Sequence, residues 1–202
     1  MNAEFDVTNR RIETERLVLR EFTIDDLDDF FEYASVPGTG ESAGWPHHES
    51  KEYSLRILNH FLEGKHTFAL VLKENNKVIG SLGIEKYGVE DKLSEFFNYK
   101  GREIGYVLSA AYWGRGLMPE AVKAVIDYLF NELDYDFLLC GYYDKNDRSR
   151  RVQEKCGFKP YRKLVFSTKL GNEEPGVLNL LINPNKKIEL EFSHPETLIY
   201  KR

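Results

Sequence analysis

Residues 112–121 read Tyr112-Trp113-Gly114-Arg115-Gly116-Leu117-Met118-Pro119-Glu120-Ala121. This is a glycine-rich turn between a β-like run and an amphipathic helix-like run, with a proline near the first turn of that helix. The first amides of a helix have no internal acceptors, and with the positive end of the helix dipole they form a site for phosphate. Glycines let a phosphate approach the backbone closely. The turn therefore predicts a backbone site for a pyrophosphate.

Two familiar phosphate motifs do not describe this turn. No Gly-Lys-Ser/Thr follows it, and Pro119 stands where a dinucleotide fingerprint has its third glycine. The turn is therefore neither a P-loop nor a Rossmann turn. From these residues alone, the turn can also be interpreted as a tight strand-to-helix connection that binds no ligand, because short glycine motifs match many sequences.

The rest of the chain alternates between β-like and helix-like runs. Two β-rich runs, 67–72 and 78–87, flank a short polar turn, which predicts a hairpin and an antiparallel middle of the sheet. Too few strand-helix-strand repeats are present for a barrel, so the order indicates a mixed α/β (α+β) fold. Further strands are predicted at 16–22, 103–108, 137–143, 161–168 and 177–182, and the last two are separated by a Gly/Pro-containing turn. Helices are predicted after the Thr23 cap, at 53–62 before Gly64 as the stop, at 119–133 and at 146–156.

The composition limits the class of protein. With 202 residues, 42% apolar and 30% charged, the chain is expected to form one domain rather than a disordered segment. A net charge of −5 has the wrong sign for holding nucleic acid as the main partner. No apolar run is long enough to cross a bilayer and no secretory signal is visible, so a cytoplasmic protein without a membrane partner is expected. Cys140 and Cys156 are expected to be reduced thiols, and no metal-ligand spacing occurs.

A second segment makes the interpretation specific. It reads Asn146-Asp147-Arg148-Ser149-Arg150-Arg151-Val152-Gln153-Glu154-Lys155-Cys156-Gly157-Phe158. Combined with the turn, it resembles the acetyl-coenzyme A (acetyl-CoA) signature of the GNAT N-acetyltransferase superfamily, in particular its Rim-type (RimJ/RimL-like) branch of ribosomal-protein N-terminal acetyltransferases. The shared pattern is Trp-Gly-Arg/Lys-Gly with Glu-Ala opening the helix, then Asn-x-x-Ser and Lys-x-Gly-Phe. Residues 14–20 and 80–83 resemble the family's opening and third strands.

The resemblance implies a fold and a co-substrate. The expected fold is that of GNAT acyl-CoA N-acyltransferases, a central and mostly antiparallel sheet of six to seven strands flanked by about four helices. Residues 1–183 would form the N-acetyltransferase domain and 184–202 an extension that adds a strand or mediates a dimer contact, in a monomer or homodimer. Acetyl-CoA would be the co-substrate. The binding residues carried over are Val107, Leu108, Trp113, Gly114, Arg115, Gly116, Leu117, Met118, Asn146 and Ser149.

Acetyl transfer to an amine also requires proton transfers. The amine attacks the thioester only as the free base, and many GNAT members have a basic carboxylate where Glu103 begins a strand, so Glu103 is the first candidate base and Glu85 the second. Ser149 in the Asn-x-x-Ser block is preferred as proton donor to the leaving thiolate, with Tyr161 as alternative. A surface role stays open for each of these side chains. A backbone amide near Val107 and Leu108 would hold the oxyanion, as in this family.

Several questions stay open at the level of sequence. His47 and His48 lie in the loop where acceptors enter Rim-type proteins, but surface histidines are the simpler interpretation. The acceptor is an amine of unspecified type, either a protein N-terminus or a small molecule. A module that senses acetyl-CoA without turnover is the competing function. Ile188, Leu190 and Phe192 alternate like a strand within 184–202, beyond the family pattern.

Overall fold

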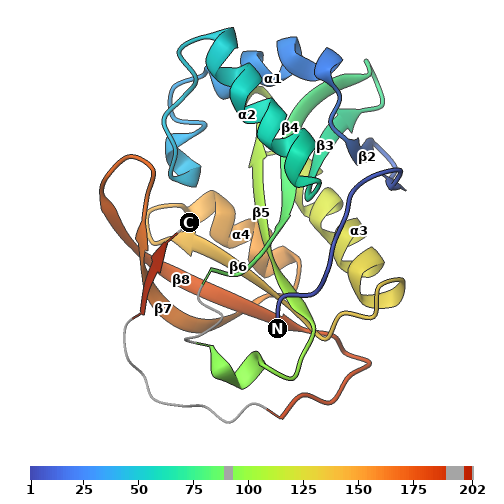
Figure 1. Cartoon of the computed structure of the whole chain (residues 1–202), viewed down its shortest axis with the longest axis vertical. Helices are drawn as coiled ribbons and strands as arrows, with labels where there is room; N and C mark the ends of the chain where they lie inside the picture. Colours follow the sequence, from blue (N-terminus) through green and yellow to red (C-terminus); the bar gives the residue numbers. More distant parts are fainter. Residues whose placement is uncertain (89–92, 190–197, 202) are drawn as a thin grey trace. The chain divides into compact units, whose positions relative to one another are not determined.

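The computed structural model describes residues 1–88, 93–189 and 198–201. Within these ranges the chain forms nine strands and four α-helices (Figure 1). The helices are α1 (Leu27–Ala34), α2 (Lys51–Gly64), α3 (Leu117–Asn131) and α4 (Asp147–Lys155). The strands are β1 (Arg11–Glu13), β2 (Leu17–Glu21), β3 (Thr67–Leu72), β4 (Lys77–Glu85), β5 (Gly101–Leu108), β6 (Phe137–Tyr143), β7 (Lys159–Ser167), β8 (Glu173–Ile182) and β9 (Leu198–Lys201).

Hydrogen bonds join the strands in the order β1-β2-β3-β4-β5-β6-β8-β7-β9. Strands β1 to β4 pair antiparallel, as do β6 with β8 and β7 with β8, whereas β5 with β6 and β7 with β9 are parallel. The expected α+β fold with a mostly antiparallel sheet and four helices is therefore confirmed. The strand count exceeds the expected six to seven because β1 and β9 are too short to show a period of two in the sequence.

The chain divides into two compact units. Unit 1 comprises Met1–Glu4, Glu85–Ile104 and Ile126–Arg202, and unit 2 comprises Phe5–Ile84 and Gly105–Val125. Strand β5 and helix α3 each contribute residues to both units. The assignment of residues 1–183 to one family domain with an extension at 184–202 stays a prediction.

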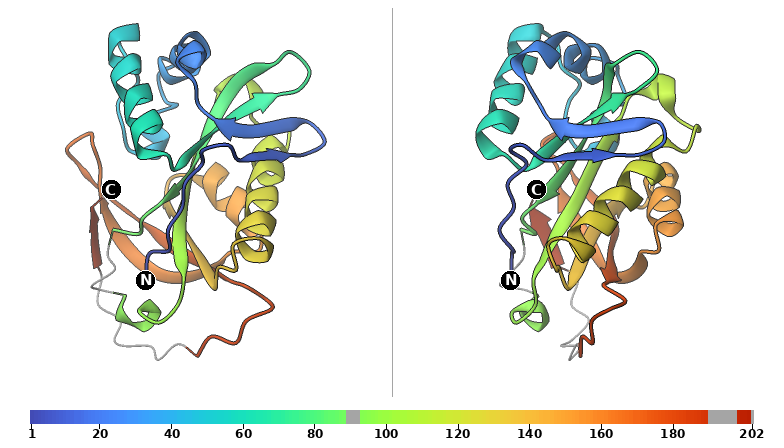
Figure 2. Two further views of the ribbon diagram at one scale, coloured as in Figure 1. Left: turned by 45° about the vertical axis from the view of Figure 1, so that its right-hand side comes forward. Right: turned by 90° about the vertical axis from the view of Figure 1, so that its right-hand side faces the viewer.

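In unit 2, helices α1 and α2 pack against strands β2, β3 and β4 (Figure 2). Strand β3 is buried along its whole length, in agreement with its continuous apolar run. The α-helical spacing of apolar residues in α1 and α2 turns their side chains into the same cluster. The buried members of this cluster are Val18, Phe22, Phe30, Tyr33, Ala34, Leu58, Ala69, Val71 and Val78.

Local chemistry sets where these helices begin and end. The α1 region begins at Asp26, whose carboxylate accepts from the Thr23 amide at 2.8 Å and from the Arg20 guanidinium at 2.7 and 2.8 Å. Helix α2 starts where the Ser50 hydroxyl accepts from the amide of Tyr53 at 3.2 Å. Gly64 was expected to stop α2, but it is the last helical residue. Lys65 takes the left-handed conformation instead, at φ 51°, while its amide bonds back to Phe61 O at 3.0 Å.

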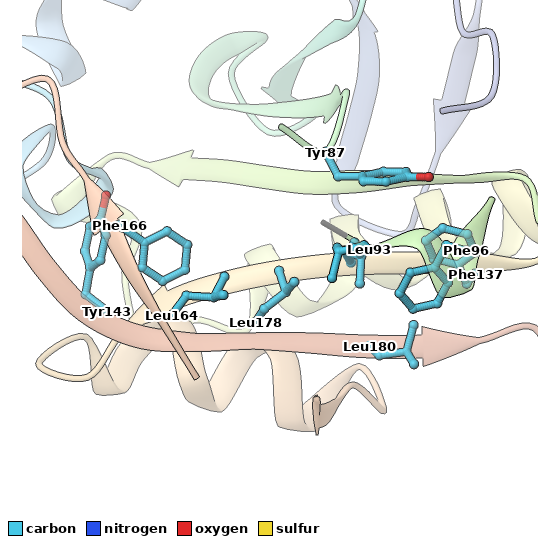
Figure 3. Close-up of a cluster of buried hydrophobic side chains, with 10 residues drawn as sticks. Tyr87, Leu93, Phe96, Phe137, Tyr143, Leu164, Phe166, Leu178 and Leu180 are labelled. Carbon is cyan, nitrogen blue, oxygen red and sulfur yellow. The ribbon is translucent and has the colours of Figure 1, made fainter. Parts of the chain in front are cut away.

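In unit 1, an apolar cluster covers one face of strands β6, β7 and β8 (Figure 3). Leu178 and Leu180 of β8 belong to it, while Asn179 between them faces the other side, as alternation along a strand requires. On that side Asn179 meets Gln153 of α4. The buried members of the cluster are Tyr87, Leu93, Phe96, Phe137, Leu139, Tyr143, Leu164, Phe166, Leu178 and Leu180.

The Gly/Pro-containing turn expected between the last two predicted strands is shorter than the sequence indicated, because β8 already begins at Glu173. Pro175 and Gly176 lie inside β8, opposite Val165 and Leu164 of β7. A Cβ on Gly176 would meet the carbonyl oxygen of Tyr142 at 2.2 Å, so this glycine allows close approach of β6 and β8 rather than a turn. The turn itself lies before β8, where Gly171 has φ 79°.

The predicted strand in the extension is displaced along the chain. Ile188 lies in no strand and packs against the unit 1 cluster, and Leu190 and Phe192 lie outside the described residues. Instead β9 pairs in parallel with β7, from Leu164↔Leu198 to Ser167↔Lys201.

Candidate active site

The glycine-rich turn presents its backbone to solvent. Gly114 and Gly116 both have φ 77°, a left-handed conformation that side chains with a Cβ disfavour, and Arg115 between them is exposed. Helix α3 then begins at Leu117, two residues earlier than predicted. In the described part of the chain, the amides of residues 115–118 donate no backbone hydrogen bond, and the first backbone donation in α3 is from Glu120 to Gly116 O at 3.2 Å. These four N–H groups form a row of donors next to the positive end of the helix dipole.

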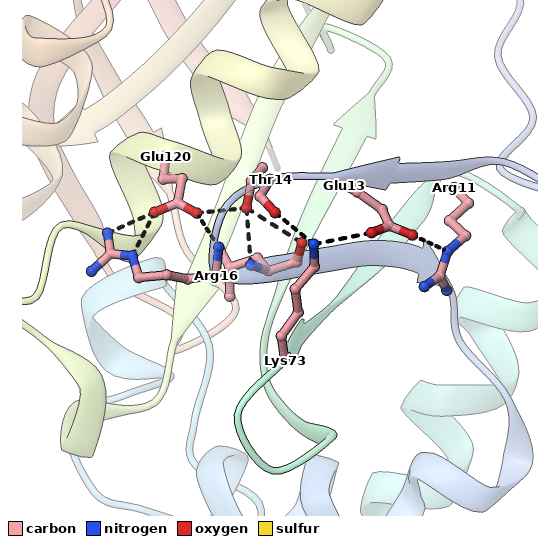
Figure 4. A network of polar contacts seen from close by, with 7 residues as sticks. Arg11, Glu13, Thr14, Arg16, Lys73 and Glu120 are labelled. Carbon is pink, nitrogen blue, oxygen red and sulfur yellow. Dashed lines mark hydrogen bonds and ion pairs between the residues drawn. The ribbon is translucent and has the colours of Figure 1, made fainter.

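A clamp of polar contacts holds this turn against the segment before β2 (Figure 4). The Glu120 carboxylate accepts from the Thr14 hydroxyl at 2.6 Å and from the Arg16 amide at 2.9 Å, and it pairs with the Arg16 guanidinium at 2.6 Å. Arg16 also donates to the carbonyl of Arg115 at 2.9 Å. Burial would raise the pKa of Glu120, but these hydrogen bonds outweigh burial and lower it below its ordinary value. Sequence reasoning missed this clamp because its partners lie about a hundred residues apart.

The C-terminal end of β5 approaches β4 closely. The Ser109 amide donates to Ile79 O at 2.8 Å. A Cβ on Gly80 would lie 2.4 Å from Val107 O, so only glycine permits this spacing. The Trp113 indole donates to Leu108 O at 2.8 Å and thereby ties the turn to the strand end. Val107, Leu108 and the turn thus form one hydrogen-bonded region of unit 2.

The second predicted segment forms a polar group in unit 1. Asn146 caps α4, because its side-chain oxygen accepts from the Ser149 amide at 3.0 Å. Ser149 is half-buried, and its hydroxyl oxygen accepts from Gln153 Nε2 at 3.2 Å. Gln153 is fully buried and continues this group to Asn179. Sequence analysis did not single out Gln153 or Asn179; a polar residue on the buried face of α4 was the available signal.

Tyr161 lies in a different polar contact. Its hydroxyl donates to Glu95 Oε1, which also accepts from Arg162 Nη2 at 2.9 Å. Burial raises the pKa of Tyr161, and the neighbouring Glu95 carboxylate raises it further. As the structure stands, the Tyr161 proton is directed to a carboxylate, which weakens Tyr161 as a donor to a thiolate.

The two carboxylates expected as candidate bases differ in burial. Glu103 of β5 is 3% exposed and lies opposite Leu139 of β6 in the parallel register. Glu85 is the last residue of β4 and is half-buried. Glu103 is therefore not an exposed surface residue of the strand, which was the alternative to its role as a base.

The expectation of two surface histidines is wrong for His48. His48 is 3% exposed, its Nδ1 lies 2.7 Å from Ser54 Oγ, and the rings of Phe30 and Tyr53 surround it. Burial lowers the pKa of His48 to about 4, so the imidazole is neutral at pH 7. His47 is partly exposed and pairs with Glu41 at 2.7 Å.

Two basic side chains in and next to α4 form ion pairs. Arg150 contacts Asp147 at 2.9 Å and Glu154 at 2.8 Å, and Lys145 pairs with Glu174 at 2.5 Å. Within the described ranges, no three His, Cys, Asp or Glu side chains gather as a metal site. No α-helix in this part of the chain is long and apolar enough to cross a bilayer. Cys140 and Cys156 are buried, and neither forms a disulfide within the described residues.

Comparisons with known proteins agree with this arrangement. A family model described as "Acetyltransferase (GNAT) domain" matches residues 16–159. The chain is 29% identical over 152 residues to the uncharacterized N-acetyltransferase p20 of Bacillus licheniformis, covering 72% of this chain and 80% of that protein.

Two solved structures show the same fold. One is ribosomal-protein-S5-alanine acetyltransferase from Vibrio fischeri, with a TM-score of 0.67 at 21% identity over 89% of this chain and 100% of that chain. The other is spermidine N-acetyltransferase from Vibrio cholerae in complex with CoA and spermine, with a TM-score of 0.67 at 15% identity over 84% and 97% of the two chains. With the glycine-rich turn and the Asn-x-x-Ser block in place, and with the family model spanning most of its length, the chain belongs to the GNAT acetyltransferase family and is an N-acetyltransferase.

Proposed function

We propose that the protein transfers the acetyl group of acetyl-CoA to a primary amine by direct attack in a ternary complex. The observation that carries this proposal is the row of amides from Arg115 to Met118, which donate no backbone hydrogen bond in the described part of the chain. A pyrophosphate fits such donors because its oxygens accept hydrogen bonds and its charge complements the helix dipole. The clamp between Glu120 and Arg16 supports the proposal, since it fixes the turn before any ligand binds.

The remaining co-substrate contacts follow from the family resemblance. Asn146 would contact the pantetheine or nucleotide arm, and a backbone amide near Val107 and Leu108 would donate to the acetyl oxygen. When bound, acetyl-CoA supplies an activated thioester carbonyl. A backbone donor aimed at that oxygen stabilises the negative charge that develops during attack.

Glu103 is proposed as the general base. A protein α-amino group has a pKa near 8 and a lysine near 10.4, so most of the amine carries a proton at pH 7 that must be removed before attack. Glu103 is 3% exposed, so its carboxylate lies inside the fold rather than on the surface, and a carboxylate is a side chain that can accept this proton.

Ser149 is proposed as the donor to the leaving sulfur, in preference to Tyr161. The Tyr161 proton is directed to Glu95, whereas the Ser149 oxygen accepts from Gln153. Covalent catalysis by cysteine is not needed for this route. A sensor without turnover is not supported, because the family and the named relative are N-acetyltransferases.

The acceptor is proposed to be a protein N-terminus or a small amine. Structural neighbours whose names include a ribosomal-protein acetylase and a spermidine acetylase share the fold, and fold alone does not choose an acceptor. A monomeric or homodimeric cytoplasmic protein, as expected from the sequence, stays a prediction.

The test is a substitution of the base. Glu103→Gln keeps the shape of the side chain but removes its basicity, so kcat should fall roughly 10²- to 10⁴-fold. Calorimetry should find the same acetyl-CoA affinity as in the wild type. The assay follows coenzyme A release across N-terminal peptides, polyamines and aminoglycosides, with Glu85→Gln measured as the second candidate base and the exposed Glu154→Gln as the control. Unchanged turnover in Glu103→Gln would remove Glu103 as the base, and absence of acetyl-CoA binding to the wild type would remove the proposed function.

A further inference from the structure

Gln153 is the unusual residue of helix α4. The other described side chains of this short helix are mostly charged and exposed, yet Gln153 is 0% exposed. A buried amide needs partners for two donor hydrogens and one acceptor oxygen, because an unpaired polar group costs free energy. Its partners are the carbonyl oxygen of Gly141 at 3.2 Å, the hydroxyl oxygen of Ser149 at 3.2 Å and the side-chain nitrogen of Asn179 at 2.8 Å.

These contacts fix the direction of each hydrogen bond. The carbonyl of Gly141 can only accept, so the Gln153 nitrogen must face it and the Gln153 oxygen must face Asn179. The same nitrogen has a second hydrogen, which it donates to the Ser149 oxygen. A hydroxyl has a single hydrogen of its own, and Ser149 therefore directs that hydrogen away from Gln153.

From this we infer that Gln153, oriented by Asn179, is a positioning residue for Ser149. It holds the serine oxygen as an acceptor, so that the serine's own hydrogen is donated away from the Gln153 amide. The inference rests on the proposed function, in which Ser149 serves the leaving sulfur. The family pattern Asn-x-x-Ser contains Asn146 and Ser149 but not Gln153 or Asn179, so the inference concerns this chain's own residues.

The chemistry of the step is as follows. The amine nitrogen forms a bond to the acetyl carbon, the carbon–sulfur bond breaks, and sulfur takes its electron pair. Sulfur receives the proton of Ser149, while Glu103 takes the proton that the amine loses. Water then returns a proton to Ser149 and removes one from Glu103. Gln153 makes no bond to a reacting atom; it acts only by fixing where the Ser149 proton points.

Two substitutions test the role of Gln153. Gln153→Leu keeps a similar volume and removes the donor to Ser149, so kcat should fall about 10- to 100-fold. The acetyl-CoA KM should stay within about 2-fold, because Gln153 is itself fully buried and is not among the residues proposed to bind the co-substrate. The double substitution Gln153→Leu with Asn179→Leu removes both amides, so no Asn179 donor is left buried without an acceptor. It replaces the single variant in the assay if Gln153→Leu alone folds poorly. Glu154→Gln is the matched control, one residue further along α4 and exposed, and it should keep the wild-type kcat.

The deciding readout is the coupling to Ser149. If Gln153 acts through the serine, Gln153→Leu lowers kcat in the wild type but adds nothing in Ser149→Ala. A merely structural role lowers kcat by the same factor in both backgrounds, and that result, or an unchanged kcat in Gln153→Leu, overturns the inference while the proposed function stands. A wild-type protein that releases no coenzyme A with any amine overturns the proposed function and this inference together.

Discussion

Gly80→Ala should damage the active site through the backbone rather than through any catalytic side chain. The added Cβ would lie 2.4 Å from Val107 O and 3.1 Å from Leu108 Cα, both of them backbone atoms. Real Cβ atoms essentially never come closer than 3.0 Å to another heavy atom, so β4 and β5 must separate. Overpacking of this kind costs about 1–3 kcal/mol of unfolding free energy.

The displaced residues are those proposed to present the oxyanion donor. A misplacement of about 1 Å can cost on the order of 10²-fold in rate, so kcat in Gly80→Ala should fall more than stability alone explains at a temperature where the protein stays folded. Urea denaturation and coenzyme A release measure the two effects separately.

A matched control separates the clash from the general effect of replacing glycine. Gly64→Ala also adds one methyl in unit 2, but the atoms nearest to its Cβ belong to the His66 imidazole, a side chain that can rotate away when it gives up its contact with Gly64 O. This variant should keep kcat and should lose less stability than Gly80→Ala, because a side chain yields more easily than a backbone and alanine is the better helix former. If Gly80→Ala has the same urea midpoint of unfolding as the wild type and also keeps the full kcat, the reasoning about the β4–β5 spacing is refuted.

Three further predictions follow from the polar contacts. The pKa of folded His48 is about 4, below its ordinary value of 6.5. The contribution of His48 to the unfolding free energy should therefore be constant above pH 6.5 and fall by about 3 kcal/mol as the pH is lowered to 4. Urea denaturation measured at several pH values should show this fall in the wild type and not in His48→Gln. Glu120→Gln should raise the acetyl-CoA KM, because the turn is held less firmly. It should also lack the loss of stability that the wild type shows as the pH falls below 4.5. Equal KM values in the two proteins would contradict the role of Glu120 in holding the turn. Ser149→Ala should lower kcat roughly 10²-fold, whereas Tyr161→Phe should keep kcat but lose about 1–3 kcal/mol of stability, because buried Glu95 loses a donor; the reverse pattern of kcat losses would restore Tyr161 as the proton donor.

The elements with a clear period or a strong turn signal could be predicted from the sequence. The strand at 137–143 matches β6 at both ends, and the helix after Gly116 was predicted within two residues. The glycine-rich turn could be identified because its expected role depends on the backbone. Glycine is the residue that adopts positive φ most easily, so its position in the sequence indicates where such a backbone conformation is needed. The family resemblance then supplied the fold.

What could not be predicted depends on contacts between distant residues. Glu120 meets Thr14 across a separation of 106 positions, and Gln153 meets Asn179 across 26. Local patterns do not encode such pairs, so the clamp and the support of Ser149 appeared only with the structure. Burial of His48 also depends on rings brought in from α1 and α2, whereas its sequence neighbours suggested an open loop.

The position of β9 has a practical consequence for anyone who shortens the chain. Residues 164–167 of β7 bond on one side to β8 and on the other to β9, so removing the last residues would expose a row of unsatisfied amides and carbonyls. Unpaired strand edges pair with other chains, and a version trimmed to the extension boundary at 183 would therefore tend to self-associate.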